Sequence, residues 1–487
     1  MRIHIVAVSG TGMGSLAGLL GELGHQVSGS DVAFDPPMGP LLESWGVHCL
    51  RGFDPAHLDP RPDLVVIGNV CRKDNPEARA AIDGGLPYTH IAGALQRFAL
   101  EGTRPLVVAG THGKTTTTSL AAWLLEGAGR EPGFLVGGVP SNFERSFRAA
   151  RRRKLPLAGD APSATTPPFV LEGDEYDTAF FEKSAKFLHY RAEVAIVTSI
   201  EHDHVDIYPS WDSYADAFRK FVATVPESGL VVANAADPAV VEAVQASARA
   251  DVAWYALEGQ ETHGVAPRWL GAPALTDRRG TAFDLYLGGV AAGRLVVPLG
   301  GRHNVANALA ALAATVEGYG VKLREVMKPL AEFRGVRRRQ EVVGEPGGVV
   351  VIDDFAHHPT AVRETLAALR ARFAEGRLFA VFEPRSATAC RAMHQAEYAR
   401  SFGDADVILL APLGRAGLSE SERLDTARLS EDLTRLGKKA RAFDAIDPIV
   451  SELSAEARPG DVIALLSNGA FGGIREKLLR ALGTARS

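Results

Sequence analysis

The sequence predicts an α/β protein with three domains, each built around a mostly parallel β-sheet. Short apolar segments alternate with amphipathic segments of helical period along the whole chain, which is typical of βα units. The chain has 487 residues, and at about 150 residues per domain this length accommodates three domains. Glycine-rich turns follow the strands that open the first two domains, as in sheets that bind nucleotides.

Composition and charge argue against several classes of partner. The net charge is −5, and basic and acidic residues are interspersed, so nucleic acid and membrane surfaces are not expected as partners. No apolar run approaches the ~20 residues that span a bilayer, and the first residues lack a signal-peptide pattern. Cys49, Cys71 and Cys390 share no motif and are expected to be free thiols. We expect a cytoplasmic protein, and the sequence leaves open whether it is a monomer or a homodimer.

The first block, residues 1–103, has the pattern of a Rossmann-like domain. A strand is expected at Ile3–Val8, followed by a glycine turn and a helix whose apolar face carries Leu16, Leu19, Leu20 and Leu23. The turn departs from G-x-G-x-x-G, but its N–H groups at a helix N-terminus still suit a diphosphate. The candidate contacts are Gly10, Thr11, Gly12, Met13, Gly14 and Ser15. Asp31 follows the second strand, where an acid meets a ribose in dinucleotide folds. Taken alone, this turn fits an NAD enzyme, another nucleotide site or a structural turn.

The second block, residues 104–332, opens with a phosphate loop. A buried strand leads into a glycine turn, a lysine and hydroxyl residues, and an apolar-periodic segment follows at Leu120–Leu125. N–H groups of such a turn hold polyphosphate oxygens, Lys114 can reach the terminal phosphates, and the Thr115 hydroxyl can ligate Mg²⁺. The spacing is shorter than G-x4-GK-[ST], because Gly110 stands four residues before Lys114. The candidate ATP contacts are Gly110, Thr111, His112, Gly113, Lys114, Thr115 and Thr116.

Carboxylates gather at the ends of the next two expected strands. The strand Phe169–Glu172 ends in a segment with four acidic residues, the last of which is Asp177. The strand Val194–Ser199 leads into three acids and two histidines before Tyr208. Carboxylates beside a triphosphate repel it unless a divalent cation lies between, so Mg²⁺ ligands are expected here. The spacing His202-x-His204 belongs to no zinc framework, which disfavours zinc. The alternative is an acidic surface turn.

Two further segments complete the pattern. A helix is expected from about His303, and Asn304 and Asn307 share one of its faces, where carboxamides can read an adenine edge or cap the helix. Residues 144–168 lack apolar periodicity and predict a mobile surface insertion. The third block, residues 333–487, repeats the doubly wound pattern. Its expected strands are Val349–Asp353, Leu378–Phe382, Val407–Ala411 and Val462–Ser467.

The order of these motifs resembles the Mur ligases, the ATP-dependent amide-forming enzymes of peptidoglycan synthesis. The resemblance rests on Gly-Thr-His-Gly-Lys-Thr, the acidic strand end, Asp-His, Gly-Arg-His-Asn-x-x-Asn-Ala, Gly-Val-Arg-Arg and Asp-Asp-x-x-His-His-Pro. It implies an N-terminal Rossmann-like domain for a UDP-sugar, a central P-loop ATPase domain and a C-terminal Rossmann-like domain for the amine. The segments Glu172–Lys183, Phe382–Ser386 and Ser467–Gly473 are similar to the murein-recycling branch. That branch joins UDP-N-acetylmuramate to the tripeptide L-alanyl-γ-D-glutamyl-meso-diaminopimelate.

The resemblance also implies roles for single residues. Lys114 would contact the β and γ phosphates, Thr115 and Glu172 one Mg²⁺, and His204 a second Mg²⁺. The remaining ATP contacts would be His303, Asn304, Asn307 and Asp354. Several Mur ligases carry a carbamylated lysine where this chain has Arg219 and Lys220, and the muramate-specific branches also lack it.

The implied reaction passes through an acyl phosphate, which forms when the muramoyl carboxylate attacks the γ-phosphorus of ATP. Lys114, Mg²⁺ and an arginine of the third block, Arg337 or Arg338, would neutralise the charge. For the peptide amine we predict contacts from Arg385, Asn468 and Gly469, because a carboxylate favours arginine and small residues expose N–H groups. The alternatives are an L-alanine ligase of the same family and a nucleotide-binding regulator without catalysis.

Overall fold

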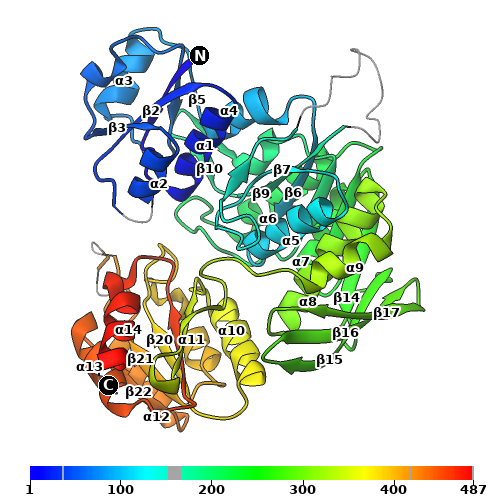
Figure 1. Cartoon of the computed structure of the whole chain (residues 1–487), viewed down its shortest axis with the longest axis vertical. Coiled ribbons are helices and arrows are strands. Elements are labelled where there is room, and N and C mark those ends of the chain that lie inside the picture. Colours follow the sequence, from blue (N-terminus) through cyan, green and yellow to red (C-terminus); the bar gives the residue numbers. More distant parts are fainter. Residues whose placement is uncertain (36–37, 152–165, 416–417, 420, 485–487) are drawn as a thin grey trace.

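The structure, a computed structural model, describes residues 1–35, 38–151, 166–415, 418–419 and 421–484. Figure 1 shows three bodies in chain order, an N-terminal one in blue, a middle one from cyan to light green, and a C-terminal one from yellow to red. Each contains a β-sheet with helices packed on it. The predicted α/β class with three domains is therefore confirmed.

The N-terminal domain is a five-stranded parallel sheet in the order β3-β2-β1-β4-β5. Strand β4 is buried along its whole length, as expected of an apolar run inside a parallel sheet. The glycine turn after β1 lies at the carboxyl edge of this sheet, where such sheets bind ligands. The strands are β1 (Arg2–Val6), β2 (Gln26–Asp31), β3 (His48–Arg51), β4 (Leu64–Ile67) and β5 (Tyr88–Thr89). The helices are α1 (Thr11–Glu22), α2 (Met38–Ser44), α3 (Pro76–Asp83) and α4 (Ile91–Leu95).

The middle domain is built on a ten-stranded sheet in the order β17-β16-β15-β14-β13-β12-β6-β9-β7-β8. Strand β6 lies beside β9 and β12, so the phosphate loop after β6 shares one sheet edge with the acidic ends of both neighbours. The strands are β6 (Arg104–Ala109), β7 (Gly133–Leu135), β8 (Phe147–Arg148), β9 (Pro168–Gly173), β12 (Val194–Val197), β13 (Leu230–Asn234), β14 (Asp251–Leu257), β15 (Trp269–Asp277), β16 (Gly280–Leu287) and β17 (Val290–Val297). The helices are α5 (Lys114–Gly127), α6 (Trp211–Thr224), α7 (Pro238–Ser247), α8 (Arg302–Ala313) and α9 (Leu323–Ala331), and a separate hairpin joins β10 (Asp177–Ala179) to β11 (Glu182–Ala185).

The C-terminal domain has a six-stranded sheet in the order β18-β19-β23-β20-β21-β22, and its strands are parallel except β18. The strands are β18 (Glu341–Gly344), β19 (Val350–Asp354), β20 (Leu378–Phe382), β21 (Val407–Leu410), β22 (Lys439–Ala442) and β23 (Val462–Leu466). The helices are α10 (Pro359–Arg372), α11 (Gln395–Ser401), α12 (Thr426–Arg435), α13 (Ile446–Glu456) and α14 (Ile474–Thr484).

The buried core is shared between the first two domains, whereas residues from β18 onward pack in cores of their own. One apolar cluster contains Leu16 and Leu42 of the N-terminal domain together with Phe169 and Phe221 of the middle domain. Among the described residues, both clusters of the C-terminal domain lie entirely within that domain. The first two domains therefore pack as one body, whereas the third has a core of its own.

Part of the expected insertion belongs to the sheet. Strand β8 pairs antiparallel with β7, and the buried Phe147 ring packs edge-on against Trp45 of the N-terminal domain, with ring centroids 4.8 Å apart. The first residues of the predicted surface insertion thus include a strand of the sheet and a buried aromatic side chain, which the neighbouring arginines obscure in the sequence pattern. Residues 152–165 of the predicted insertion lie outside the described residues, and its last residue, Pro168, begins β9.

Within the described ranges, no helix is both long and apolar enough to cross a membrane.

Candidate active site

A cavity of about 1580 Å³ is lined by all three domains. Most of the predicted site residues line it: Gly10, Thr11, Gly12, Met13, Thr111, His112, Gly113, Lys114, Thr115, Thr116, Glu172, His204, His303, Asn304, Asn307, Asp354 and Asn468. The other predicted site residues are not in its lining: Gly14, Ser15, Asp31, Gly110, Arg337, Arg338, Arg385 and Gly469. The cavity thus gathers the nucleotide motifs of distant segments at one place.

The phosphate loop depends on two glycines with positive φ. Gly110 has φ 136° and Gly113 has φ 82°, conformations that side chains rarely adopt. A Cβ at Gly110 would lie 2.1 Å from Thr198 Oγ1, and one at Gly113 would lie 2.5 Å from Asn307 Oδ1. The loop therefore fits closely between β12 and α8, with the N-terminus of α5 open to the cavity.

The Lys114 ammonium is held by a buried acid that the sequence analysis did not single out. Nζ donates to the Gly110 carbonyl at 2.5 Å and to Glu175 Oε2 at 3.0 Å. Glu175 is 1% exposed. Burial alone would raise the pKa of this carboxyl, but the charges of Lys114 and His204 lower it to about 2. Glu175 is therefore ionised and forms an ion pair with Lys114 in this structure.

Thr115 and Glu172 lie together beside the loop. Thr115 Oγ1 donates to Glu172 Oε2 at 3.2 Å, and the Gly137 amide donates to Oε1 at 2.6 Å. Burial first, and then the charge of Asp174, raise the pKa of Glu172 to about 6. A half-buried carboxylate next to a hydroxyl at a phosphate loop fits a divalent cation such as Mg²⁺.

His204 is paired with an acid. Its Nε2 lies 3.3 Å from Glu175 Oε1, and the residue has φ 50°. Burial favours the neutral ring, but the hydrogen bond and charge of Glu175 raise the pKa of His204 above its usual value. Its predicted role at a second Mg²⁺ would require the imidazole to leave Glu175 and lose a proton, because a metal binds the neutral ring.

The predicted adenine residues lie behind the loop. Asn304 Nδ2 donates to the Gly300 carbonyl at 2.8 Å, and Asn307 Nδ2 donates to Asn304 Oδ1 at 3.2 Å. Thr117 Oγ1 donates to Asn307 Oδ1 at 3.1 Å. These bonds fix both carboxamides at the cavity wall. Their role toward adenine stays a prediction.

Residues predicted to contact ATP also lie at the boundary between the middle and C-terminal domains, which is called the seam below. Asp354 accepts hydrogen bonds from the amides of Gln340 at 2.7 Å and Ala356 at 2.8 Å, and burial raises its pKa. Gln340 Nε2 lies 3.2 Å from His303 Nε2, and burial lowers the pKa of His303. Gln340 thus links Asp354, which binds its backbone amide, to His303, which contacts its side chain.

A histidine–glutamate cluster closes the same seam. Glu201 Oε2 lies 3.3 Å from His112 Nε2 and 3.5 Å from His358 Nδ1, and it accepts from Thr360 Oγ1 at 2.8 Å. Burial first, and then the charge of His112, lower the pKa of His358 to about 3. Asp203, hydrogen-bonded by Thr388 Oγ1 at 2.5 Å, makes a second polar link to the C-terminal domain.

The arginine next to Thr115 is Arg339, not one of the two predicted arginines. Arg339 Nη2 donates to Thr115 Oγ1 at 3.0 Å. Arg338 instead donates to the carbonyls of Ser467 and Gly469, both at 2.7 Å, and Arg337 is exposed. Arg339 therefore contacts the phosphate loop directly, and the catalytic role of Arg337 or Arg338 stays a prediction.

The predicted UDP turn is tied to the middle domain. Ser15 Oγ and Ser146 Oγ are 2.6 Å apart, so Ser15 contributes to the contact between domains. Asp31 accepts from the amides of Ser9 and Val32, each at 2.8 Å. Its carboxylate therefore stabilises the turn after β1, and its predicted contact with a ribose stays untested.

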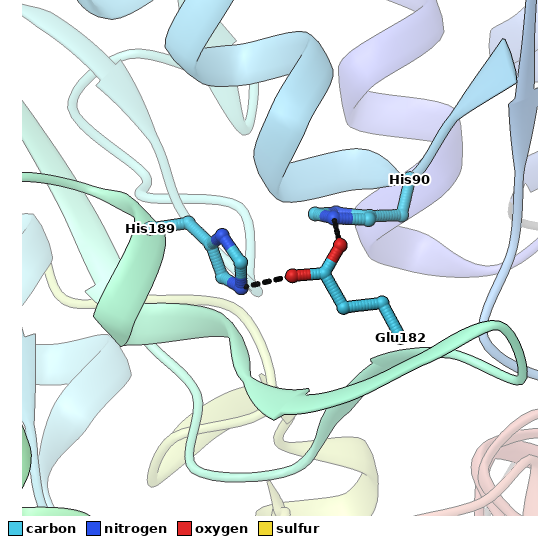
Figure 2. Close-up of side chains that lie close together, drawn as sticks. All are labelled: His90, Glu182 and His189. Carbon is cyan, nitrogen blue, oxygen red and sulfur yellow. Dashed lines mark hydrogen bonds and ion pairs between the residues drawn. The ribbon is translucent and has the colours of Figure 1, made fainter.

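Figure 2 shows a second link between these two domains, formed by His90, Glu182 and His189. His90 Nε2 lies 3.1 Å from Glu182 Oε2, and His189 Nε2 lies 3.5 Å from Oε1. The Gly93 amide donates to His90 Nδ1 at 3.2 Å, so the ring proton is on Nε2 and is donated to Glu182. The cluster is thus a hydrogen-bonded link rather than a preformed metal site, because a metal needs the lone pair of Nε2.

The predicted peptide contacts lie together in the C-terminal domain. Arg385 Nη1 lies 3.6 Å from Glu383 Oε1, and a Cβ at Gly469 would lie 2.0 Å from Arg385 Cδ. Asn468 Oδ1 is buried without a hydrogen-bond partner among the described residues. Only glycine at 469 leaves room for the Arg385 side chain in this position.

Sequence reasoning missed Glu175, Glu201 and Arg339. Glu175 belongs to the quoted acidic run, but its distance from Lys114 depends on how the chain turns after β9. Arg338 and Arg339 look equivalent in the sequence. The positive φ of Arg338, 60°, turns the chain between them, so their side chains take different directions. The signal for Glu201 was its place beside the two histidines after β12.

Comparison with protein-family models finds matches over nearly the whole chain. The family descriptions are Mur ligase family, catalytic domain, for residues 2–103, Mur ligase middle domain for residues 108–315, and Mur ligase, glutamate ligase domain, for residues 338–469. These three spans follow the order of the three domains.

Relatives of similar length align with this chain over almost their whole lengths. The chain is 38% identical over 483 residues to UDP-N-acetylmuramate–L-alanyl-γ-D-glutamyl-meso-2,6-diaminoheptandioate ligase of Escherichia coli (strain K12), covering 99% of this chain and 98% of the relative. It is 35% identical to UDP-N-acetylmuramate–L-alanine ligase of Roseiflexus sp. (strain RS-1), covering 96% of each chain. The crystal structure of a murein peptide ligase from Psychrobacter arcticus is 34% identical, with a TM-score of 0.73 over 99% of both chains.

Proposed function

Because the chain belongs to the Mur ligase family, we propose that it is an ATP-dependent ligase of murein recycling. It joins the muramoyl carboxylate of UDP-N-acetylmuramate to the amine of L-alanyl-γ-D-glutamyl-meso-diaminopimelate. The observation that carries the proposal is the full-length identity to the Escherichia coli ligase named for this tripeptide. The cavity supports it, since its walls bring together a glycine turn for UDP, a phosphate loop and the C-terminal domain.

The reaction has two steps. A carboxylate oxygen of the muramoyl group attacks the γ-phosphorus of ATP, and ADP leaves. The peptide amine then attacks the acyl phosphate carbon, loses a proton and displaces inorganic phosphate, so that an amide bond replaces the acyl phosphate bond. The contribution of the protein is to align the reactants and to balance their charge.

Lys114 is the cation for the terminal phosphates. In this structure it bonds Glu175 and the Gly110 carbonyl, so phosphate oxygens take over positions that these groups fill now. Arg339 approaches the same turn from the C-terminal domain. Both side chains can therefore stabilise the charge that spreads over the γ-phosphoryl oxygens during transfer.

Thr115 and Glu172 would hold Mg²⁺, with His204 as the residue predicted for a second ion. A bound Mg²⁺ would neutralise charge on the β and γ phosphates. Glu172→Gln keeps the shape but loses the charge, so we expect the Mg²⁺ concentration for half-maximal activity to rise and the rate to fall. An unchanged Mg²⁺ titration would contradict the assignment.

The deciding experiment is a competition between amines. The purified protein receives ATP, Mg²⁺ and UDP-N-acetylmuramate, with the tripeptide and L-alanine together at equal concentration. We expect ADP release and the tripeptide product to dominate, as analysed by mass spectrometry. Preferential formation of UDP-N-acetylmuramoyl-L-alanine would assign the chain to de novo synthesis. Nucleotide binding without ADP release would support the non-catalytic alternative.

A further inference from the structure

A second buried lysine lines the cavity and has no part in the reaction described so far. Lys186 follows strand β11 and is 5% exposed. It lies among the cavity residues together with Asp174 and Tyr176. A buried ammonium is costly unless it is paired, so its surroundings are informative.

Among the described residues, the Lys186 ammonium is paired with one carboxylate and one aromatic ring. Nζ lies 3.3 Å from Asp174 Oδ2 and 3.9 Å from the centroid of the Tyr176 ring. Its backbone amide donates to the Tyr176 carbonyl at 3.3 Å. An ammonium has three donors, and the carboxylate and the ring face account for two directions. One direction is left for an anion in the cavity.

The position of Lys186 is between the two substrate regions. The short helix that Lys186 opens, residues 186–189, contacts α4 of the N-terminal domain and strand β9 of the middle domain. Lys186 also lines the same cavity as the glycine turn after β1 and Lys114 of the phosphate loop. Lys186 therefore stands where a UDP-linked acceptor from the N-terminal domain meets the nucleotide.

The reaction needs a cation at this point. The acceptor carboxylate must approach a triphosphate in a cavity that already holds Glu172, Asp174 and Glu175, and Lys114 faces the phosphate side. An anion moved into such surroundings needs a fixed positive partner of its own. The ordinary alternative is that Lys186 only compensates Asp174.

We propose that the Lys186 ammonium binds the muramoyl carboxylate of the acceptor and positions it for attack on ATP. This inference rests on the proposed function, since it concerns the same acceptor. It assigns to the end of the β10–β11 hairpin the recognition of the carboxylate of the lactyl group, the substituent that distinguishes N-acetylmuramate from N-acetylglucosamine.

The test compares two ligands that differ in the lactyl group that carries this carboxylate. Affinities for UDP-N-acetylmuramate and UDP-N-acetylglucosamine are measured by calorimetry, with a non-hydrolysable ATP analogue and Mg²⁺ present. For the wild-type protein we expect tighter binding of the muramate by about 10- to 100-fold, the range of a hydrogen bond between charged groups. Lys186→Met should abolish this preference and leave UDP-N-acetylglucosamine affinity within about twofold, whereas Lys186→Arg should retain part of the preference.

Two controls separate binding from structural effects. Lys183→Met removes an exposed lysine of the same hairpin and should keep the wild-type preference. Lys186→Met with Asp174→Asn leaves no unpaired carboxylate behind, so loss of preference in this double variant cannot come from repulsion by Asp174. Unchanged UDP-N-acetylglucosamine binding shows that each variant is folded.

Each outcome decides one question. If the wild-type protein prefers the muramate and Lys186→Met keeps that preference, the inference is wrong while the proposed function stands. A wild-type protein that binds both ligands equally also overturns the inference. If it binds neither UDP-sugar, the proposed function itself fails.

Discussion

The Arg339 guanidinium donates a hydrogen bond to Thr115 Oγ1 at 3.0 Å, which connects the segment before β18 to the first turn of α5. The contact joins the C-terminal domain to the phosphate loop. Arg339 also lies over the Phe355 ring, 4.6 Å from its centroid, and burial lowers the pKa of its guanidinium. Arginine at this place is positioned by packing as well as by charge.

Arg339→Ala should lower kcat by about 10²- to 10³-fold, the usual effect of removing a donor that stabilises transition-state charge. Steady-state kinetics with saturating ATP measure it. Arg334→Ala, which removes an exposed side chain nearby, is the matched control and should remain active. A larger loss in Arg338→Ala than in Arg339→Ala would favour the sequence-based choice of arginine.

Lys114→Ala should remove activity and also destabilise the protein. The rate should drop by at least about 10²-fold, and the free energy of unfolding should fall by about 1–3 kcal/mol because Glu175 is left without its closest cation. Adding Glu175→Gln removes the unpaired charge. The double variant should recover thermal stability but not activity, and failure to recover stability would show that the pair is not energetically coupled.

His358→Asn should make the protein less sensitive to acid. His358 has a pKa of about 3 in the folded protein, below the ordinary value of about 6.5. The unfolded chain takes up this proton as the pH falls below about 6.5, whereas the folded chain does not until about 3, so folding is disfavoured across that window. Between pH 7 and pH 5 the wild type should lose about 1–2 kcal/mol more than the variant.

Asparagine is chosen because His358 is the N-cap of α10, where its Nδ1 accepts from the Thr360 amide, and asparagine also caps well. Urea unfolding followed by circular dichroism at the two pH values gives the comparison. Parallel stability curves for the two proteins would show that His358 already binds its proton in the folded state.

Gly18→Ala should destabilise the contact between the first two domains. Alanine ordinarily favours a helix over glycine by about 1 kcal/mol, but a Cβ here would lie 2.2 Å from Phe147 Cζ. Displacing Phe147 should cost about 1–3 kcal/mol. Gly21→Ala in the same helix is the matched control, since its Cβ would meet only the Trp45 carbonyl at 3.8 Å. The midpoint of thermal unfolding should therefore fall for Gly18→Ala and rise for Gly21→Ala. Equal shifts for the two variants would contradict the packing argument.

The sequence predicted those parts of the fold whose signal is local. Strand β20 has its predicted bounds, Leu378–Phe382, and the strand, turn and helix around Lys114 appear as expected. The antiparallel strands β15, β16 and β17 were not predicted, because their exposed positions blur the alternation of apolar and polar residues. Predictions failed most where a side chain acts across domains, as Phe147 does.

In the candidate site, residue types were more predictable than contacts. The lysine, hydroxyls and acids of the loop and its neighbours gather in one cavity. Which acid faces Lys114 depends on the turn after β9, and which arginine reaches Thr115 depends on the positive φ of Arg338. Such backbone turns are set by tertiary packing, and a single sequence does not contain them.

The separate core of the C-terminal domain determines what its movement costs. The contacts described at its seam with the phosphate-loop region are polar, namely Arg339 with Thr115, Thr360 with Glu201 and Thr388 with Asp203. Separating these contacts would expose groups that water can hydrate. Dissolved salt screens charges on both sides of the seam. Higher ionic strength should therefore weaken this polar part of the contact between the two domains.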